Sequence, residues 1–544
     1  MFRVLEGLDD GRLRAGERLR YNDAESSGQP QNHRNSLFED TLPLLLGETA
    51  DPVAAGWRLR DLSRAAVDHG PQLMEELAGH RQQLSTSDPA ILGALLRVVH
   101  SSLLNMGWPT IEGLDPNWIE QVESALPPGT PNCFLLQQLY AMMRSESALA
   151  LLVASLRERP PQQWMEAAQA LSPLMQRDDW PVASMYPAGL DGLQHPGLAS
   201  PLLDLANHTY RTGMVRPHPA ADRLAMLNHL LGEVVGRLSL FEENPRSFGD
   251  DVDTVQVRLG EAVALAVSLC DTLGLIGDES SVGKLHQAIE LRHRRVQCEA
   301  AGALARLDDE FGQKRLIELV AEPAARLRAI HYADELGLGE LVEDQYRSDT
   351  ATAEAEMALW LSQPQQMGVP PTAIEVIDSR RLLWPSFQDP VDVFLVRYEY
   401  NFGDRTYSNV GISGPATFSM SADVANLALD DIYAIYAGWH ADHPDIFSVV
   451  ADQFNEAQVR VMDQFQRYLE RQGYQQLKPA LLGFFLDEQA GVFTAIRDAI
   501  QCVVVTDGLE TIDQPTSGRL RPLMPEDLFN LYMGRKMLRT FNSN

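Results

Sequence analysis

Between residues 37 and 361 the apolar positions recur at the spacing of an α-helix. In the stretch "PVAAGWRLRDLSRAAV" (52–67) they fall near every third or fourth position. The residues of this expected apolar stripe are Val53, Trp57, Leu59, Leu62 and Ala66. Strand-like alternation of β-branched and polar residues is missing here, and Pro and Gly mark the gaps between helical stretches. The pattern predicts a mainly α fold for residues 37–361.

A similar helix ending is written more than once in this helical region. "DTLGLIG" (271–277) and "GALARLD" (302–308) lie in two similar stretches, 262–289 and 296–320, and a third stretch follows at 327–347. In the middle stretch two predicted helices carry the apolar positions Val296, Ala300, Ala303, Leu304, Leu307, Phe311, Leu316, Ile317, Leu319 and Val320. Each stretch predicts a helix pair that cannot bury its own apolar face, so neighbouring pairs are expected to stack.

These stretches resemble the HEAT-like repeats first named from phycobilisome lyases, whose pattern runs "A..ALG.LGD...V..L...L". The resemblance is carried by 271–278 with Val282 and Leu285, and in the second stretch by Ala301, Ala303, Leu304, Leu307, Asp308 and Leu316. It covers 262–347, with the third unit matching least. It implies an α-solenoid of helix pairs. Such repeats serve lyases, hydroxylases, adaptors and scaffolds alike, so the resemblance implies an architecture and no particular activity.

The pattern changes near residue 362, where "LSQPQQMGVPP" reads as a linker. Strands are expected at 372–380, within 390–420, at 479–488 and at 499–508, with a hairpin turn at Gly403. Helices are expected in 421–443 and 445–473, and a closing helix begins at Pro525. The predicted organisation is therefore a partly flexible segment 1–36, a helical repeat domain 37–361, and a smaller α+β domain 362–544 with a mixed or antiparallel sheet, which resembles no family that we recognise.

Composition narrows the range of partners and compartments. The 544 residues include 45 Lys and Arg against 75 Asp and Glu, a formal charge of −30 that would repel a phosphate backbone, so no nucleic-acid partner is expected. The N-terminus lacks a secretory apolar segment, and "AVALAVSLC" (262–270) is too short to span a bilayer, so no membrane is expected. Four scattered cysteines fit neither a disulfide framework nor a zinc site, which favours a cytoplasmic location.

Motifs for catalysis are also missing. The sequence contains no Walker-type or dinucleotide-type glycine loop, no GxSxG and no His–Glu dipeptide of the kind found in HEAT-like iron hydroxylases. His440, Asp442, His443 and Asp445 in "GWHADHPD" could contribute to a metal site, but a helix end broken by Pro444 is the favoured interpretation. In the acidic loop 241–253, helix capping by Asp251 and Asp253 is favoured over calcium binding. We therefore predict no catalytic residue, metal or cofactor.

Two groups of residues are candidates for binding. Arg292, His293, Arg294 and Arg295 in "LRHRRV" lie between two repeats, where they form either a solvated turn or a contact for an anion or acidic peptide; Glu290 and Glu299 are the nearby carboxylates that could neutralise them. Aromatic residues crowd the second domain, mainly as core, with a ligand or peptide surface as the alternative. From this second group Trp384, Tyr398, Trp439 and His440 are candidates.

The sequence favours a non-catalytic protein-binding scaffold or adaptor that uses its helical-repeat surface to hold one or more protein partners. The alternative is an enzyme, lyase-like or a hydrolase, with a site in the α+β domain or at the domain junction that could use Glu399, His440 or Asp445. The two hypotheses differ in whether titratable side chains converge in a hollow of the second domain.

Overall fold

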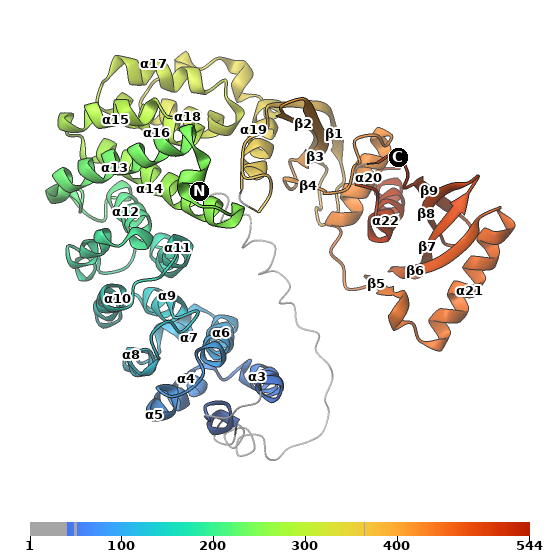
Figure 1. The fold of residues 1–544 in the computed structure, drawn as a ribbon, viewed down its shortest axis with the longest axis horizontal. Coiled ribbons are helices and arrows are strands. Elements are labelled where there is room, and N and C mark those ends of the chain that lie inside the picture. The colour runs from blue at the N-terminus through green and yellow to red at the C-terminus, as the bar shows by residue number, and fades with distance from the viewer. Residues whose placement is uncertain (1–37, 39–40, 48–51, 364, 520, 544) are drawn as a thin grey trace. The chain divides into compact units, whose positions relative to one another are not determined.

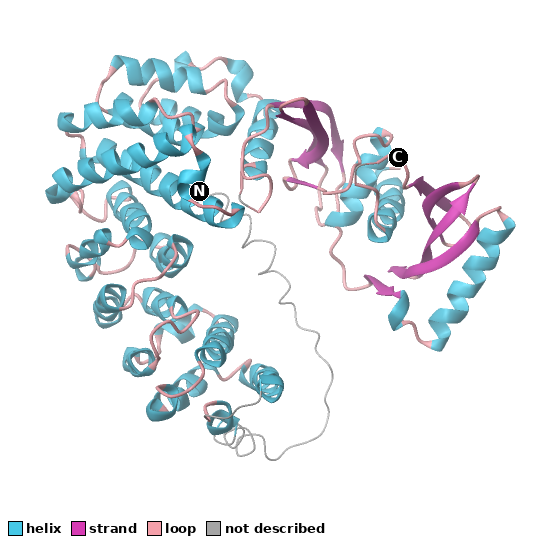
Figure 2. Ribbon diagram, viewed as in Figure 1, coloured by secondary structure: helices cyan, strands magenta, loops and turns pink. Residues whose placement is uncertain are grey.

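The computed structural model describes residues 38, 41–47, 52–363, 365–519 and 521–543, so the predicted N-terminal segment 1–36 lies outside the described residues. The chain forms two compact units, 1–214 and 215–544, each of which is described by itself. Helices make up the first unit and the beginning of the second, and strands appear only towards the C-terminus (Figures 1 and 2). The prediction of a mainly helical chain followed by an α+β region is confirmed at this level.

The first unit is helical throughout its described residues. Its α-helices are α3 (Pro52–Ala66), α4 (Gly70–Gly79), α5 (Arg81–Leu84), α6 (Pro89–Met106), α7 (Trp108–Glu112), α8 (Pro116–Ala125), α9 (Phe134–Met143), α10 (Glu146–Glu158), α11 (Trp164–Leu171) and α12 (Pro196–Arg211). Side chains of Asp88, Asp115 and Ser145 accept hydrogen bonds from backbone N–H groups at the starts of α6, α8 and α10. These caps explain where the helices begin, because they satisfy donors that the helix itself leaves open.

One expectation for α3 is wrong. Leu62 and Ala66 are fully buried, but Val53 and Trp57 are 68% and 59% exposed. The buried face of α3 runs through Ala55 instead, which lies on the opposite side of the helix from Val53. The spacing of apolar residues does not show which face of a helix is buried, because burial depends on the elements that pack against it.

The second unit begins with seven α-helices before its first strand. They are α13 (Leu224–Glu243), α14 (Val252–Ile276), α15 (Val282–Ile289), α16 (Arg294–Arg306), α17 (Glu310–Leu319), α18 (Pro323–Glu335) and α19 (Asp349–Leu361). The carboxylate of Asp251 accepts a hydrogen bond from the backbone N–H of Thr254 at 2.8 Å, and Asp253 lies in the first turn of α14. The capping interpretation of the acidic loop is therefore confirmed.

The repeated sequence ending corresponds to a repeated helix ending. After α14, α16 and α18 the chain turns through Gly277, Asp308 and Gly337, which all have the left-handed backbone (φ 78°, 58° and 73°). Such a residue is a common helix stop, because it lets the last carbonyls find donors. Asp309 then caps α17, accepting from the backbone N–H of Gly312 at 2.8 Å. The second α-helix of a pair follows Gly277 and Asp308 within a few residues, whereas Gly337 is followed by two 3-10 turns before α19.

Small residues let these helices approach closely. A Cβ on Gly274 would lie 2.9 Å from the Cα of Ala303, and a Cβ on Gly302 would lie 2.7 Å from the ring of Tyr332. Leu304 and Leu316 are fully buried, as predicted. Phe311 was expected in the core but is 48% exposed, because it lies in the first turn of α17 and stacks only partly, on His286.

The C-terminal region holds two antiparallel sheets. The first has the order β1 (Ala373–Leu382), β2 (Val391–Phe402), β3 (Arg405–Ser413), β4 (Phe418–Ser419), and α20 (Leu429–His440) follows it. The second has the order β5 (Ile446–Val450), β6 (Gln475–Phe485), β7 (Glu488–Arg497), β8 (Ile500–Thr506), β9 (Thr511–Pro515), with α21 (Glu456–Arg471) after β5 and α22 (Pro525–Asn542) at the end. The prediction missed β5, β7 and β9 as separate strands, and it placed β5 inside a helix that begins only after Asn455, its N-cap.

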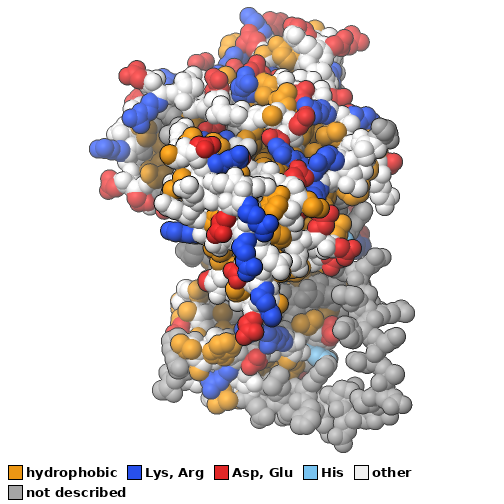
Figure 3. Space-filling model, turned by 90° about the vertical axis from the view of Figure 1, so that its right-hand side faces the viewer, with side chains coloured by type: hydrophobic (Ala, Val, Ile, Leu, Met, Phe, Trp, Pro, Cys, Tyr) orange, Lys and Arg blue, Asp and Glu red, His pale blue; other side chains and the backbone are white. Residues whose placement is uncertain are grey.

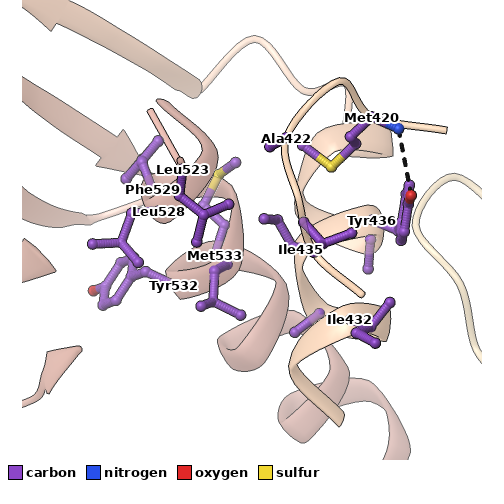
Figure 4. Close-up of a cluster of buried hydrophobic side chains, with 14 of the residues drawn as sticks. Met420, Ala422, Ile432, Ile435, Tyr436, Leu523, Leu528, Phe529, Tyr532 and Met533 are labelled. Atoms are coloured by element: carbon purple, nitrogen blue, oxygen red, sulfur yellow. Dashed lines mark hydrogen bonds between the residues drawn. The ribbon is translucent and has the colours of Figure 1, made fainter. Parts of the chain in front are cut away.

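Helices cover both faces of each sheet. One face of the first sheet packs on α20 and one face of the second packs on α22, in a shared core (Figure 4). The other face of the first sheet packs against α19, through Met357 and Leu361, and that of the second packs against α21, through Met462 and Leu469. Helix α19 also packs on α18, so it joins the helical pairs to the first sheet.

Helices α20 and α22 cross at two glycines. A Cβ on Gly438 would overlap the backbone oxygen of Asn530, and a Cβ on Gly534 would overlap that of Ala434. Figure 4 shows the apolar side chains that line this pair, among them Ile432 and Tyr436 on α20 and Leu528 and Tyr532 on α22. Only glycine fits at either crossing position, because the obstacle is main chain and not a movable side chain.

Candidate functional site

The predicted basic cluster lies where α15 ends and α16 begins. Arg292 and Arg295 are exposed, whereas His293 and Arg294 are partly covered. The guanidinium of Arg294 is held on two sides, by the side-chain oxygen of Gln297 at 2.8 Å and by the carboxylate of Glu322 at 3.2 Å. The four neighbouring residues therefore divide into two that belong to the packing and two that face solvent.

The carboxylates near this cluster are not the two expected. Glu299 is buried and holds Arg328 through a 2.8 Å ion pair, and it accepts a hydrogen bond from the hydroxyl of Tyr332 at 2.5 Å. The backbone N–H of Arg292 donates to a carboxylate oxygen of Glu242 at 2.6 Å, and Glu322 pairs with Arg294. Packing of α13 and of the start of α18 brings in these distant carboxylates, which proximity along the chain could not indicate.

His293 adds no positive charge at neutral pH. Burial of its ring, and secondly the nearby charge of Arg295, lower its pKa to about 4. Its Nδ1 atom is buried without a hydrogen-bond partner among the described residues. The positive charge that this junction presents to solvent therefore comes from Arg292 and Arg295.

These two arginines differ from the other arginines of the neighbouring helices. In α16–α19 and the segments between them, ion pairs of about 3 Å or less join Arg306 to Glu335, Arg315 to Glu318, Arg326 to Glu354, Arg328 to Glu299 and Arg347 to Asp334. Across the described residues of the chain, neither Arg292 nor Arg295 has an ion pair. In a chain with 75 acidic residues, two neighbouring guanidinium groups without an ion pair in the part of the chain that the structure describes are a candidate contact for an acidic group outside the chain.

Three of the four aromatic candidates meet at the end of α20. The indole N–H of Trp384 donates to Nδ1 of His440 at 3.2 Å, and the ring of Trp439 packs on Phe418 with centroids 4.4 Å apart. The rings of Phe387 and Phe418 stack on His440 at 6.5 and 6.3 Å. Because Nδ1 accepts from Trp384, the proton of the neutral imidazole is on Nε2, and burial lowers the pKa of His440.

Tyr398 lies elsewhere. Its ring belongs to the cluster on the α19 side of the first sheet, and its hydroxyl lies 2.7 Å from that of Ser419. Trp384 and Tyr398 are 1% and 3% exposed, so both are core residues that stabilise the sheet. At the end of α20, Trp439 (54% exposed) and Phe387 (38%) offer apolar surface to solvent.

The residues considered for metal binding do not converge. Helix α20 ends at His440, and the ring of His443 turns back to accept a hydrogen bond from the backbone N–H of Asp445 at 3.2 Å. The helix end expected ahead of Pro444 is therefore present, but Nδ1 of His440 and Nδ1 of His443 accept hydrogen bonds from Trp384 and Asp445 and do not cap helix carbonyls. Over the portion of the chain that the structure describes, no three His, Cys, Asp or Glu side chains gather as a metal site would need.

A hollow of about 380 Å³ lies beside the first sheet. It is lined by Ser348, Asp349, Thr350, Ser379, Arg380, Arg381, Asp392 and Phe394. Its charged groups hold one another or close neighbours: Arg381 pairs with Asp392 at 3.0 Å, and Arg380 pairs with Asp378 and Asp430. Its lining extends from the start of α19 over β1 to Asp392 and Phe394 of β2.

Basic and acidic side chains are interspersed on the face drawn in Figure 3, so this face has no large region of a single charge sign.

Two helices, α6 and α14, are long and apolar enough to cross a membrane, but 44% and 61% of their apolar windows are buried, as in core helices. Cytoplasmic location and the lack of a membrane partner remain predictions. No family model, no curated protein and no solved structure matches the chain.

Proposed function

We propose that the chain is a non-catalytic protein-binding scaffold whose helical region is a stack of HEAT-like helix pairs. The left-handed endings at Gly277, Asp308 and Gly337 support a repeating unit. Ion pairs between successive elements also support stacking, because Arg294 at the start of α16 reaches Glu322, and Arg326 in α18 reaches Glu354 in α19. Both pairs join one helix pair to the next element along the chain.

The observation that carries the binding proposal is the pair of exposed guanidinium groups, of Arg292 and Arg295, that have no ion pair among the described residues. Connections between stacked helix pairs lie at an edge of the array, where a partner can reach them. Guanidinium groups favour bidentate contacts with carboxylates. The partner is therefore a protein that presents an acidic segment, and the net charge of −30 argues against nucleic acid in that place.

The test is capture of partners by the intact chain from the cell in which it is made. The variant with both Arg292→Glu and Arg295→Glu is expected to lose the specific partner while it folds normally, because exposed charges contribute little to stability. Lys314→Glu is the matched control, since Lys314 is 78% exposed on the neighbouring α17. Raising the salt concentration should also weaken capture by the unaltered chain.

Two results would contradict the proposal. A partner that is retained by the double variant at high salt does not use this junction. A loss of binding that is equally large in Lys314→Glu would show that overall charge, and not the junction, controls binding.

A further inference from the structure

The C-terminal region is built from two copies of a single unit, α–β–β–β–β–α. The first copy is α19, β1–β4 and α20, and the second is α21, β6–β9 and α22. Their registers agree: Leu395 pairs with Ile412 in the first copy as Val492 pairs with Val505 in the second. The first strand of each copy also has a β-bulge. The bulge in β1 lies opposite Val396 and Leu395, and the bulge in β6 lies opposite the equivalent residues Phe493 and Val492.

The closing helices agree as well. Residues 430–438 read "DDIYAIYAG" and residues 526–534 read "EDLFNLYMG", which places Gly438 and Gly534 at equivalent positions. Gly438 approaches the oxygen of Asn530 and Gly534 approaches that of Ala434, which are again equivalent positions. This reciprocity is what a two-fold relation between two copies produces.

The copies differ at one sheet edge. In the second sheet β5 pairs with the outer edge of β6, so that sheet has five strands, whereas β1 is the outermost strand of the four-stranded first sheet. Alignment of the two bulges makes Ser379 equivalent to Leu482 and Arg381 equivalent to Phe484. The edge that β5 fills in one copy is therefore open in the other, across the described residues.

Backbone groups show which side of β1 is open. In the second sheet the N–H of Leu486 donates to the carbonyl of Asp445, just ahead of β5, at 3.2 Å. At the equivalent Leu383 the side-chain amide of Asn542 takes that place, accepting from the N–H at 2.8 Å and donating to the carbonyl at 3.2 Å. By strand alternation, the N–H and C=O groups of Arg381 and Ser379 point to the same side.

The open stretch is bounded and accessible. At its far end the N–H of Val376 donates to the carboxylate of Glu354 at 3.4 Å, so side chains close both ends of the edge. Ser379 and Arg381 between them are exposed and line the hollow of about 380 Å³.

We propose that the open edge of β1 binds an extended segment of another protein, as a fifth strand antiparallel to β1. Main-chain hydrogen bonds at an unpaired edge provide such binding in other folds, and alternate side chains provide the choice of partner. In the second sheet Ile446 lies opposite Phe485 and packs on the shared core, so the segment should carry an apolar residue opposite Leu382. This edge is separate from Arg292 and Arg295, so the inference stands or falls independently of the proposed function.

The next position of the segment should be acidic. In the second sheet Phe447 stacks on Phe484 with centroids 4.5 Å apart, but the equivalent of Phe484 is Arg381. A carboxylate at the position equivalent to Phe447 would form an ion pair with Arg381, which already pairs with Asp392. A second copy of this chain fits less well, because pairing β1 with β1 through Ser379 and Arg381 would place Arg380 opposite Arg380.

The experiment attaches a probe strand to the full chain. A Gly/Ser linker of about ten residues is added after Asn544, followed by "DIESVV", the sequence 445–450 with Phe447→Glu. Because Asn542 lies at the end of the edge, the linker keeps the probe at an effective concentration of about millimolar. Hydrogen exchange at the amides of Ser379 and Arg381, read by mass spectrometry at residue level, should slow at least tenfold. Leu482 and Phe484, which β5 already covers, are internal references.

A control extension reads "DIPSPV", in which two prolines stand at the positions of Phe447 and Val449 and remove the donors that would face Arg381 and Ser379. It should leave exchange at Ser379 and Arg381 as fast as in the chain without extension. Equal exchange with both extensions would overturn the proposal. Protection in the unextended chain that rises with protein concentration would also overturn it, because the occupant would then be a second copy.

Discussion

The crossing of α20 and α22 gives the sharpest stability prediction. Replacing Gly438 or Gly534 with Ala puts a methyl group into a backbone oxygen of the partner helix, at Asn530 or Ala434. An overpacked core usually costs about 1–3 kcal/mol, and the upper end applies here because main chain cannot rotate away. The higher helix propensity of Ala offsets about 1 kcal/mol of this destabilisation. Each variant should therefore lose about 2 kcal/mol or more, with similar values for the two sites.

The measurement is the free energy of local opening from hydrogen exchange of the amides in β2, β3, β7 and β8, which reports on this domain alone. Gly236→Ala is the control, since a Cβ on Gly236 in α13 would meet nothing within 4 Å. The control should leave these amides unchanged. If both crossing variants changed the opening free energy by less than about 0.5 kcal/mol, the close approach of the two helices, and the two-fold relation derived from it, would be wrong.

Three other changes have defined outcomes. Leu304→Ala should lower the free energy of unfolding by about 2–5 kcal/mol in denaturant titration, because the side chain is fully buried between helices. Arg326→Ala should cost about 3 kcal/mol or more, since it removes the positive partner of the Glu354 carboxylate, whereas Arg347→Ala at a more exposed pair should cost under about 1 kcal/mol. Burial alone would raise the pKa of Asp507, but hydrogen bonds from Lys536 and two backbone N–H groups hold it at about 2. The stability that Asp507 adds is therefore complete above about pH 4 and lost as the pH falls towards 2, and thermal unfolding of Asp507→Asn should lack that share of the acid dependence.

The helical region could be predicted because its information is local. The left-handed stops at Gly277 and Asp308 and the cap at Asp309 are properties of neighbouring residues, so the sequence shows them directly. Phe311 was misplaced because burial depends on which other element covers a face. Strand β5 was missed because its five residues continue into a helix and its pairing partner β6 comes only after that helix.

The candidate sites divide in the same way. Clusters of charge and aromatic residues were visible, but the ion pair between Arg294 and Glu322 needs the stacking of successive helix pairs. The open edge of β1 needed both registers, because only comparison of the two sheets shows that a strand is missing.

The most direct test of the scaffold proposal is site-specific photo-crosslinking. A photoreactive side chain is placed at residue 295 in the full chain, and, as the control, at residue 314 on the neighbouring helix. We expect position 295 to form a covalent adduct with an acidic segment of a partner protein. Arg292→Glu in the same chain should reduce this adduct, and position 314 should form little. Equal adducts at both positions, or an adduct at 295 that Arg292→Glu leaves unchanged, would contradict the proposal.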